Sequence, residues 1–516
     1  MVGLDQRIAE MKALRRQREK QQGFGRPIIS SVLGEYRFVA VRDRVLHSKN
    51  WKTFHDFLFA YMRHILGSEW GNQEIAKPLL ERHPIMQCYE KVCHAQRAAG
   101  LGDGRVKETA ATGAMSLYLH VAYYLYLIDH NAQLQEKLLQ RLRSRDQFQG
   151  ARYEIAVAAL FALAGYSLAF EDESDPSTTH VEFAATHLRS GRQYSVEVKS
   201  KHRPGVVWYE GPGRREPNVG RDVRVLLNKA LSKSAHHDRV IFIELNLPGD
   251  SQGSAEPSWA PQVDATLRRA EAELGDEAPP AYVFVSNDTT LHNLDGVDGN
   301  QHLMVSGFRK TDFRSGKMMT LREAVEARDR HRDMYSLGDA IQQWLYVPST
   351  FDGEIADRVF KGTQAPMQIG NRYVVPADDG AAVEGMLIDA VMSEEERKMW
   401  GVFKLDDGTN MICALEVDQS EMEIYRRYPE TYFGVLRHVG GKLQTPLEAF
   451  EFFYETYKNS TREFLLKGLK DHPDQNVIKE MPREDLAKLY CELLANRLLA
   501  QKGRELNDFP RSVERR

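Results

Sequence analysis

The 516-residue sequence is poor in cysteine, has no long apolar run and carries no large excess of charge of one sign. Four cysteines in so long a chain are too few for a disulfide framework, so we expect a cytoplasmic protein. The N-terminal residues lack the apolar core of a secretory signal. The apolar runs at 115–128 and 155–170 are shorter than the ~20 residues that cross a bilayer, so we expect no membrane segment. Because the formal net charge is −4, any surface for nucleic acid must be a local patch.

The periodicity of apolar residues predicts a multidomain α+β protein. Steps of three and four residues between 51 and 143 indicate helices, whereas after Gly150 short β-like runs alternate with helices, which is typical of an α/β domain with a mixed sheet. Two apolar runs flank Asp-Asp-Gly-Thr at 406–409, which predicts a hairpin. We therefore expect five parts: a helical N-terminal domain at 1–145, the α/β domain at 146–310, a helical connector at 311–362, a small β-barrel-like domain at 363–440 and a helical C-terminal region at 441–516.

The segment HVEFAATHLRSGRQYSVEVKSK, residues 180–201, contains the most informative pattern. Side chains alternate between the two faces of a strand, so Glu197 and Lys199 share one face. If Ser190 and Gly191 form a two-residue turn, the hairpin places Glu182 directly opposite Lys199, with Glu197 on the diagonal. The sequence thus predicts two carboxylates and one ammonium group on the same surface.

Such a cluster suits metal-assisted hydrolysis of a phosphodiester. Carboxylate oxygens are ligands for Mg²⁺, which neutralises phosphate charge and activates a water molecule. A neighbouring lysine adds a positive charge that stabilises a developing oxyanion. The same residues would also suit an edge hairpin whose exposed face carries cross-strand Glu–Lys pairs.

The order of elements between 146 and 288 resembles the αβββαβ core of the PD-(D/E)XK nuclease superfamily, the restriction-endonuclease-like fold. In this resemblance Glu197 and Lys199 match the (D/E)XK element, and Glu182 stands where the family has its aspartate. Glu154, on the helix before the sheet, matches an accessory acid. The chain departs from the family at Val181-Glu182, which replaces Pro-Asp, and Asp175, followed by proline, is an alternative candidate.

The resemblance implies a function as well as a fold. It implies a Mg²⁺- or Mn²⁺-dependent endonuclease in which Glu182, Glu197 and Glu154 are metal ligands and Lys199 lies near the scissile phosphate. It favours DNA over RNA as the substrate, and a role in restriction, repair or anti-phage defence.

A local basic patch follows the predicted site. Nine basic and four acidic residues lie between Lys201 and Arg239, a net charge of +5. Lysine and arginine supply most of the nonspecific affinity for nucleic acid, and Trp208 and Tyr209 offer rings for base stacking. We expect nucleic-acid contacts from the patch, in particular from Lys201, Arg203, Arg214, Arg215, Arg221, Lys229 and Lys233.

Two other functions stay open at this point. A nuclease-like domain that has lost activity would serve as a nucleic-acid-binding or assembly module, and the change to Glu182 keeps that alternative. A helical scaffold would instead bind a partner protein, or a second copy of the chain, through its terminal domains.

Overall fold

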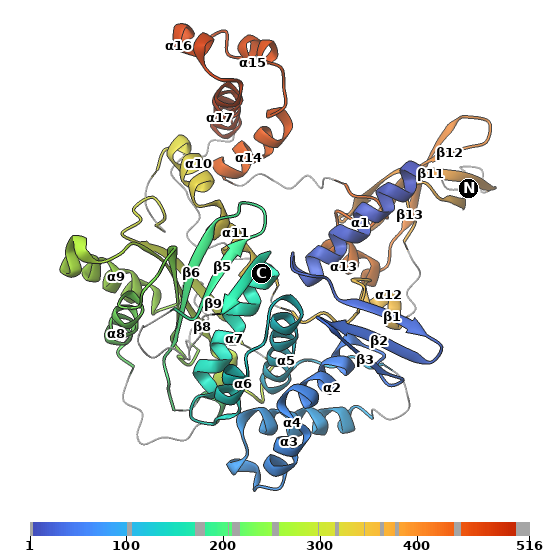
Figure 1. Ribbon diagram of the computed structural model, residues 1–516. Helices are drawn as coiled ribbons and strands as arrows, with labels where there is room; N and C mark the ends of the chain where they lie inside the picture. The colour runs from blue at the N-terminus through green and yellow to red at the C-terminus, as the bar shows by residue number, and fades with distance from the viewer. Residues whose placement is uncertain are drawn as a thin grey trace.

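The computed structural model describes residues 4–100, 106–170, 181–204, 206–208, 217–249, 257–297, 299–314, 319–344, 346–361, 366–376, 381–437 and 445–501. In these ranges the strands form a six-stranded, a four-stranded and a three-stranded sheet (Figure 1). Helices surround the largest sheet and connect it to the two smaller ones. The expected multidomain α+β architecture is confirmed.

The six-stranded sheet has strands in sequence order, β4-β5-β6-β7-β8-β9. The central strands β6, β7 and β8 are parallel, and the other neighbouring pairs are antiparallel, so the predicted mixed sheet is confirmed. The strands are β4 (Tyr166–Phe170), β5 (Phe183–His187), β6 (Gln193–Ser200), β7 (Asp238–Glu244), β8 (Ala281–Asp288) and β9 (Gln301–Phe308).

Helices cover both faces of this sheet, which explains why β7 and β8 are apolar along most of their length. Helix α7 (Phe148–Leu163) packs on the face that carries Val196 of β6 and Phe242 of β7. Helices α8 (Val219–Leu231) and α9 (Ala260–Leu274) pack on the opposite face, which carries Ile241 and Ile243. Glu197 pairs with Ile241 and therefore points to the α8 face.

The N-terminal part contributes helices to the core beneath α7. A capping box between Thr53 and Asp56 starts α2, and the apolar α5 packs directly on α7. Buried apolar residues at positions between Ile28 and Phe351 form one continuous core, which includes this face of the sheet. The helices of the whole N-terminal part are α1 (Leu4–Gln22), α2 (Phe54–Leu66), α3 (Ser68–Ile75), α4 (Pro84–Ala98), α5 (Gly113–Asn131) and α6 (Glu136–Arg143).

A three-stranded antiparallel meander interrupts these helices and was not predicted, because the N-terminal domain was expected to be helical. It comprises β1 (Ile29–Leu33), β2 (Tyr36–Val41) and β3 (Arg44–Ser48). Only Val39 and Val41 of β2 are buried in the core, while both outer strands are largely exposed. Such strands lack the clean alternation that identifies a half-buried sheet.

The second half of the chain begins with connecting helices and a small β domain. Strands β10 to β13 form an antiparallel sheet that curls, since the Cys413 thiol on β13 lies 3.5 Å from the carbonyl of Pro376 on β10. The predicted hairpin joins β12 to β13. The elements are α10 (Leu321–Arg330), α11 (Arg332–Gln343), α12 (Ala356–Lys361), β10 (Arg372–Pro376), β11 (Ala382–Ser393), β12 (Lys398–Lys404), β13 (Asn410–Glu416) and α13 (Gln419–Arg427).

The N-terminal helix and the C-terminal helices lie in different parts of the structure. Helix α1 lies against the small β domain, where Arg16 forms an ion pair of 2.9 Å with Glu430 (Figure 1). The C-terminal helices stand apart from the sheets and pack on α10. They are α14 (Pro446–Tyr457), α15 (Arg462–Gly468), α16 (Gln475–Glu480) and α17 (Arg483–Gln501). Among the described helices, none combines the length and apolar character needed to cross a membrane.

Candidate active site

The structure brings Glu182, Glu197 and Lys199 together on the α8 face of the sheet. Lys199 Nζ contacts Glu197 Oε1 directly and lies 3.5 Å from Glu182 Oε1. The Glu197 side chain is fully buried, whereas the side chains of Glu182 and Lys199 are each 19% exposed. The cluster therefore has a buried acid at its base and a lysine and a second acid that solvent can reach.

The predicted turn between β5 and β6 was wrong, although the cluster forms. The hydrogen bond between His187 N–H and the Arg192 carbonyl closes a four-residue loop at 188–191 instead of a two-residue turn. Phe183 pairs with Val196, so Glu182, one residue earlier, is next to Glu197 and not opposite Lys199. The register differs from the predicted one by two residues, which leaves every side chain on its predicted face.

Burial makes Glu197 an unusual acid. Desolvation raises its pKa to about 7; the charge of Lys199 lowers it and that of Glu182 raises it. One carboxylate oxygen, Oε2, is buried and has no hydrogen-bond partner in the described part of the chain. A buried carboxylate oxygen without a partner is costly, so this atom is suited to a proton or a cation.

Glu154 occupies a different environment. Both its oxygens accept from Arg141 of α6, at 2.8 Å each, in a bidentate ion pair. Helix α7, which carries it, covers the face of the sheet opposite to that of Glu197. Among the described residues no three acids, histidines or cysteines lie close enough to hold one metal ion. The structure therefore does not bring Glu154 together with Glu182 and Glu197 as three ligands.

The predicted nucleic-acid contacts fall into three groups. Lys201 and Arg203 both form ion pairs with Asp222 of α8, at 2.8 and 2.7 Å. Arg221 and Lys229 are exposed on α8, and the charge of Lys233 acts on Glu197. Arg214, Arg215, Tyr209, the Trp208 ring and the alternative acid Asp175 lie outside the described residues.

A buried polar network beside the cluster was missed. Arg152 of α7 forms an ion pair with Glu244 at the end of β7, and Ser200 Oγ donates to Glu244 Oε2 at 3.0 Å. Asn246 Nδ2 donates to the same Ser200 Oγ at 3.0 Å. These bonds fix the end of β6 one residue after Lys199. The signal was present in the sequence, since Arg152 and Glu244 are charged residues within apolar runs.

Comparisons of the chain with protein-family models, with curated proteins and with solved structures found no match.

Proposed function

We propose that the protein is a metal-dependent nuclease that hydrolyses phosphodiester bonds, with DNA as the preferred substrate, and that Glu182, Glu197 and Lys199 form its active site. The observation that carries the proposal is the contact of one partly exposed lysine with two carboxylates, one of which is fully buried. The resemblance to the PD-(D/E)XK superfamily supports the same assignment of roles.

The donor set fits a hard divalent cation such as Mg²⁺ or Mn²⁺. Glu197 Oε2 has no hydrogen-bond partner among the described residues. Glu182 lies close to Lys199, which also contacts Glu197, so both acids face the same point. Glu182 and Glu197 would hold the ion, with backbone carbonyls, water or substrate oxygens as further ligands. When bound, the ion would neutralise charge on the phosphate and lower the pKa of a water molecule.

Lys199 has the position of a group that stabilises negative charge. Its side chain emerges from β6, whose residues Tyr194 to Ser200 pair with β7, so the backbone that carries the lysine is already fixed when the side chain binds a phosphate oxygen. In the free protein its single positive charge lies against both acids. An ion bound by Glu182 and Glu197 would take over that task and leave Lys199 to contact the substrate.

A cleavage assay tests the proposal. Supercoiled plasmid and single-stranded RNA are incubated with the full chain in Mg²⁺, Mn²⁺ or EDTA. Glu197→Gln and Lys199→Met should each lower the cleavage rate at least about a hundredfold, because the first removes a ligand of the metal ion and the second removes the positive charge at the reacting phosphate. Lys398→Met is the matched control: Lys398 belongs to a second Glu-x-Lys tripeptide, at 396–398 in the small β domain, and the variant should cut like wild type.

The assay also distinguishes the inactive alternative. Metal-dependent cleavage that survives Glu197→Gln would contradict the site. If the wild-type chain cuts nothing, its affinity for DNA is measured separately. An affinity that is the same in Mg²⁺ and in EDTA would instead identify a nucleic-acid-binding module.

A further inference from the structure

The β1–β3 meander lies at the edge of the molecule, beside α2 and α12, and buries one of its two faces (Figure 1). Alternate residues of β2, Val39 and Val41, point into the core. Tyr36 and Phe38 therefore point to the other side, which we call the solvent face. The large side chains of the solvent face are Ile29, Leu33, Tyr36, Phe38, Val45 and His47. Contiguous exposed patches of this kind mark interaction sites.

Three aromatic rings form a cluster in the middle of the solvent face. Phe38 pairs directly with His47 across β2 and β3, and their stacked rings have centroids 5.4 Å apart. Tyr36 is the next residue of β2 on this face, and its ring centroid lies 6.4 Å from that of Phe38 and 5.7 Å from that of His47. The rings of Tyr36 and His47 are exposed. Exposed rings on a sheet are suited to stack the bases of a single strand.

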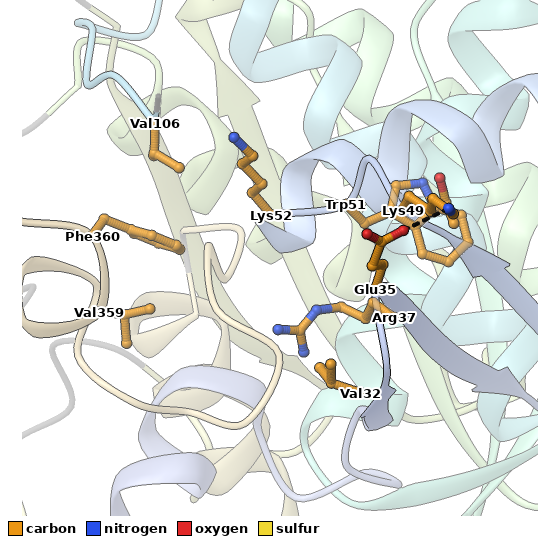
Figure 2. Close-up of a pocket in the computed structure, with 10 residues that line it drawn as sticks. Val32, Glu35, Arg37, Lys49, Trp51, Lys52, Val106, Val359 and Phe360 are labelled. Atoms are coloured by element: carbon orange, nitrogen blue, oxygen red, sulfur yellow. Dashed lines mark hydrogen bonds and ion pairs between the residues drawn. The ribbon is translucent and has the colours of Figure 1, made fainter. Parts of the chain in front are cut away.

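A lysine stands at one end of this ring cluster. Lys49 follows β3, and its Nζ lies 4.9 Å from the centroid of the Tyr36 ring. Figure 2 shows its ion pair with Glu35, at 2.6 Å. The two side chains are 49% and 77% exposed, and because an exposed pair is weak, a phosphate can replace the carboxylate as the partner of Lys49. A phosphate can thus bind here without breaking a strong internal contact.

Two arginines stand at the other end of the solvent face. Arg26 precedes β1 and donates to the His130 carbonyl at 3.3 Å, and the backbone N–H of Arg42, after β2, donates to His130 Nδ1 at 3.3 Å. Both arginines are exposed, and neither forms an ion pair with another described residue. Asp43 shares the turn with Arg42, so the arginines outnumber the acid at this end. Cations therefore flank the rings on both sides.

The size of the solvent face favours a narrow occupant. Strands of five or six residues, ~4.8 Å apart, make a face of about 300 Å². A stable interface between proteins buries ~800 Å² on each partner, so this face alone is too small to hold a second copy of the chain. A single strand needs only a narrow strip, and its unpaired bases can lie flat on rings, whereas a duplex keeps its bases stacked inside.

We propose that the solvent face of the meander binds single-stranded nucleic acid, with bases stacked on Tyr36, Phe38 and His47 and phosphates held by the cations at the two ends. Single-stranded DNA and RNA offer the same chemistry, planar bases joined by phosphates. The inference stands on the residues of the meander and does not depend on nuclease activity.

Fluorescence anisotropy of the full chain in EDTA tests the proposal. The probes are labelled oligo(dT), oligo(U) and a duplex of equal length. We expect a single strand to bind more tightly than the duplex, and Tyr36→Ala and His47→Ala each to weaken its binding at least about fivefold, since each removes a stacking ring. Tyr36→Phe, which keeps the ring, should bind like wild type. Arg42→Met should weaken binding and lower its dependence on salt.

Two control variants separate stacking from other causes. Phe452→Ala removes an exposed ring from α14, and Leu33→Ala removes an exposed apolar side chain from the solvent face, so both should bind like wild type. The proposal is overturned if the duplex binds as tightly as the single strands, or if the ring variants match Phe452→Ala. It is also overturned if Leu33→Ala binds as weakly as Tyr36→Ala, which would indicate a general apolar surface.

Sedimentation of the wild-type chain tests the rival occupant. Self-association that Leu33→Ala and Tyr36→Ala both abolish would assign the face to a second copy of the chain and overturn the proposal. A thermal melt verifies that each variant folds, and the exposed His47 decides the result if Tyr36→Ala does not fold. Because binding is measured in EDTA, a chain that cuts DNA but whose ring variants bind normally would refute this proposal and leave the nuclease intact.

Discussion

The ion pair between Arg152 and Glu244 provides a quantitative test of the structure around the candidate site. The two side chains are only 9% and 2% exposed. Removing one partner of a buried pair leaves an uncompensated charge and costs ~3–5 kcal/mol. We expect Arg152→Met and Glu244→Gln each to lower the free energy of unfolding by about that amount. Each single variant leaves one uncompensated buried charge, whereas the double variant removes both charges. Its loss of unfolding free energy should therefore be at least about 1 kcal/mol smaller than the sum of the two single losses.

The loss in Arg152→Met should depend on pH. Burial already raises the pKa of Glu244, and Arg152 opposes this rise, so the variant raises the pKa further. A carboxyl whose pKa is higher in the folded than in the unfolded protein binds an extra proton on folding, so its stabilising contribution is present at low pH and is lost as the pH rises through the folded pKa. The variant should therefore be closer to wild type at pH 5 than at pH 8.

Urea unfolding at the two pH values measures both effects. Arg15→Met, which breaks the exposed pair of Arg15 with Glu19, is the control and should change stability by about 0.5 kcal/mol or less. Additive losses in the double variant, or a loss in Arg152→Met that is the same at pH 5 and pH 8, would refute the description of a buried, coupled pair.

Three further predictions follow from particular contacts. Glu154→Gln should retain nuclease activity within about tenfold but lower the urea midpoint, because Glu154 pairs with Arg141 rather than with the acid cluster. Gly113→Ala should lower the free energy of unfolding by ~1–3 kcal/mol, since its Cβ would lie 2.4 Å from a backbone oxygen. Gly150→Ala should raise the free energy of unfolding by up to ~1 kcal/mol, because the new Cβ meets open space and alanine favours the helix α7. Acidification to pH 3.5 should lower amide-exchange protection in α1. Burial raises the pKa of Glu430, but the cations of α1 outweigh this effect and hold that pKa below its usual value. The stabilising contribution of Glu430 is therefore present near neutral pH and is lost as the pH falls.

The sequence predicts an element best where one physical signal dominates. The apolar runs of β7 and β8 were identified as strands because both of their faces are covered by helices. The β1–β3 meander gave no such signal, since its stability comes from a few residues, such as Val39 and Val41, that pack on helices distant in sequence. The partner of Glu154 was equally hidden, because the choice between Arg141 and a metal site depends on how α6 and α7 pack.

The acid cluster was predicted correctly as a grouping of residues in spite of a wrong turn, and the reason is geometric. Side chains on a strand alternate with a period of two, so a register shift of two residues changes the partner of Glu182 but not its face. A shift of one would have moved Glu182 to the α7 face, among the apolar residues of the core, and separated it from Lys199. Burial enforces this parity: Phe183 and Val196 are both fully buried in that core, and neither can exchange faces with a charged neighbour. The face of the candidate site is thus determined by the apolar residues between the acids, while the loop at 188–191 determines only which charged residues are opposite one another.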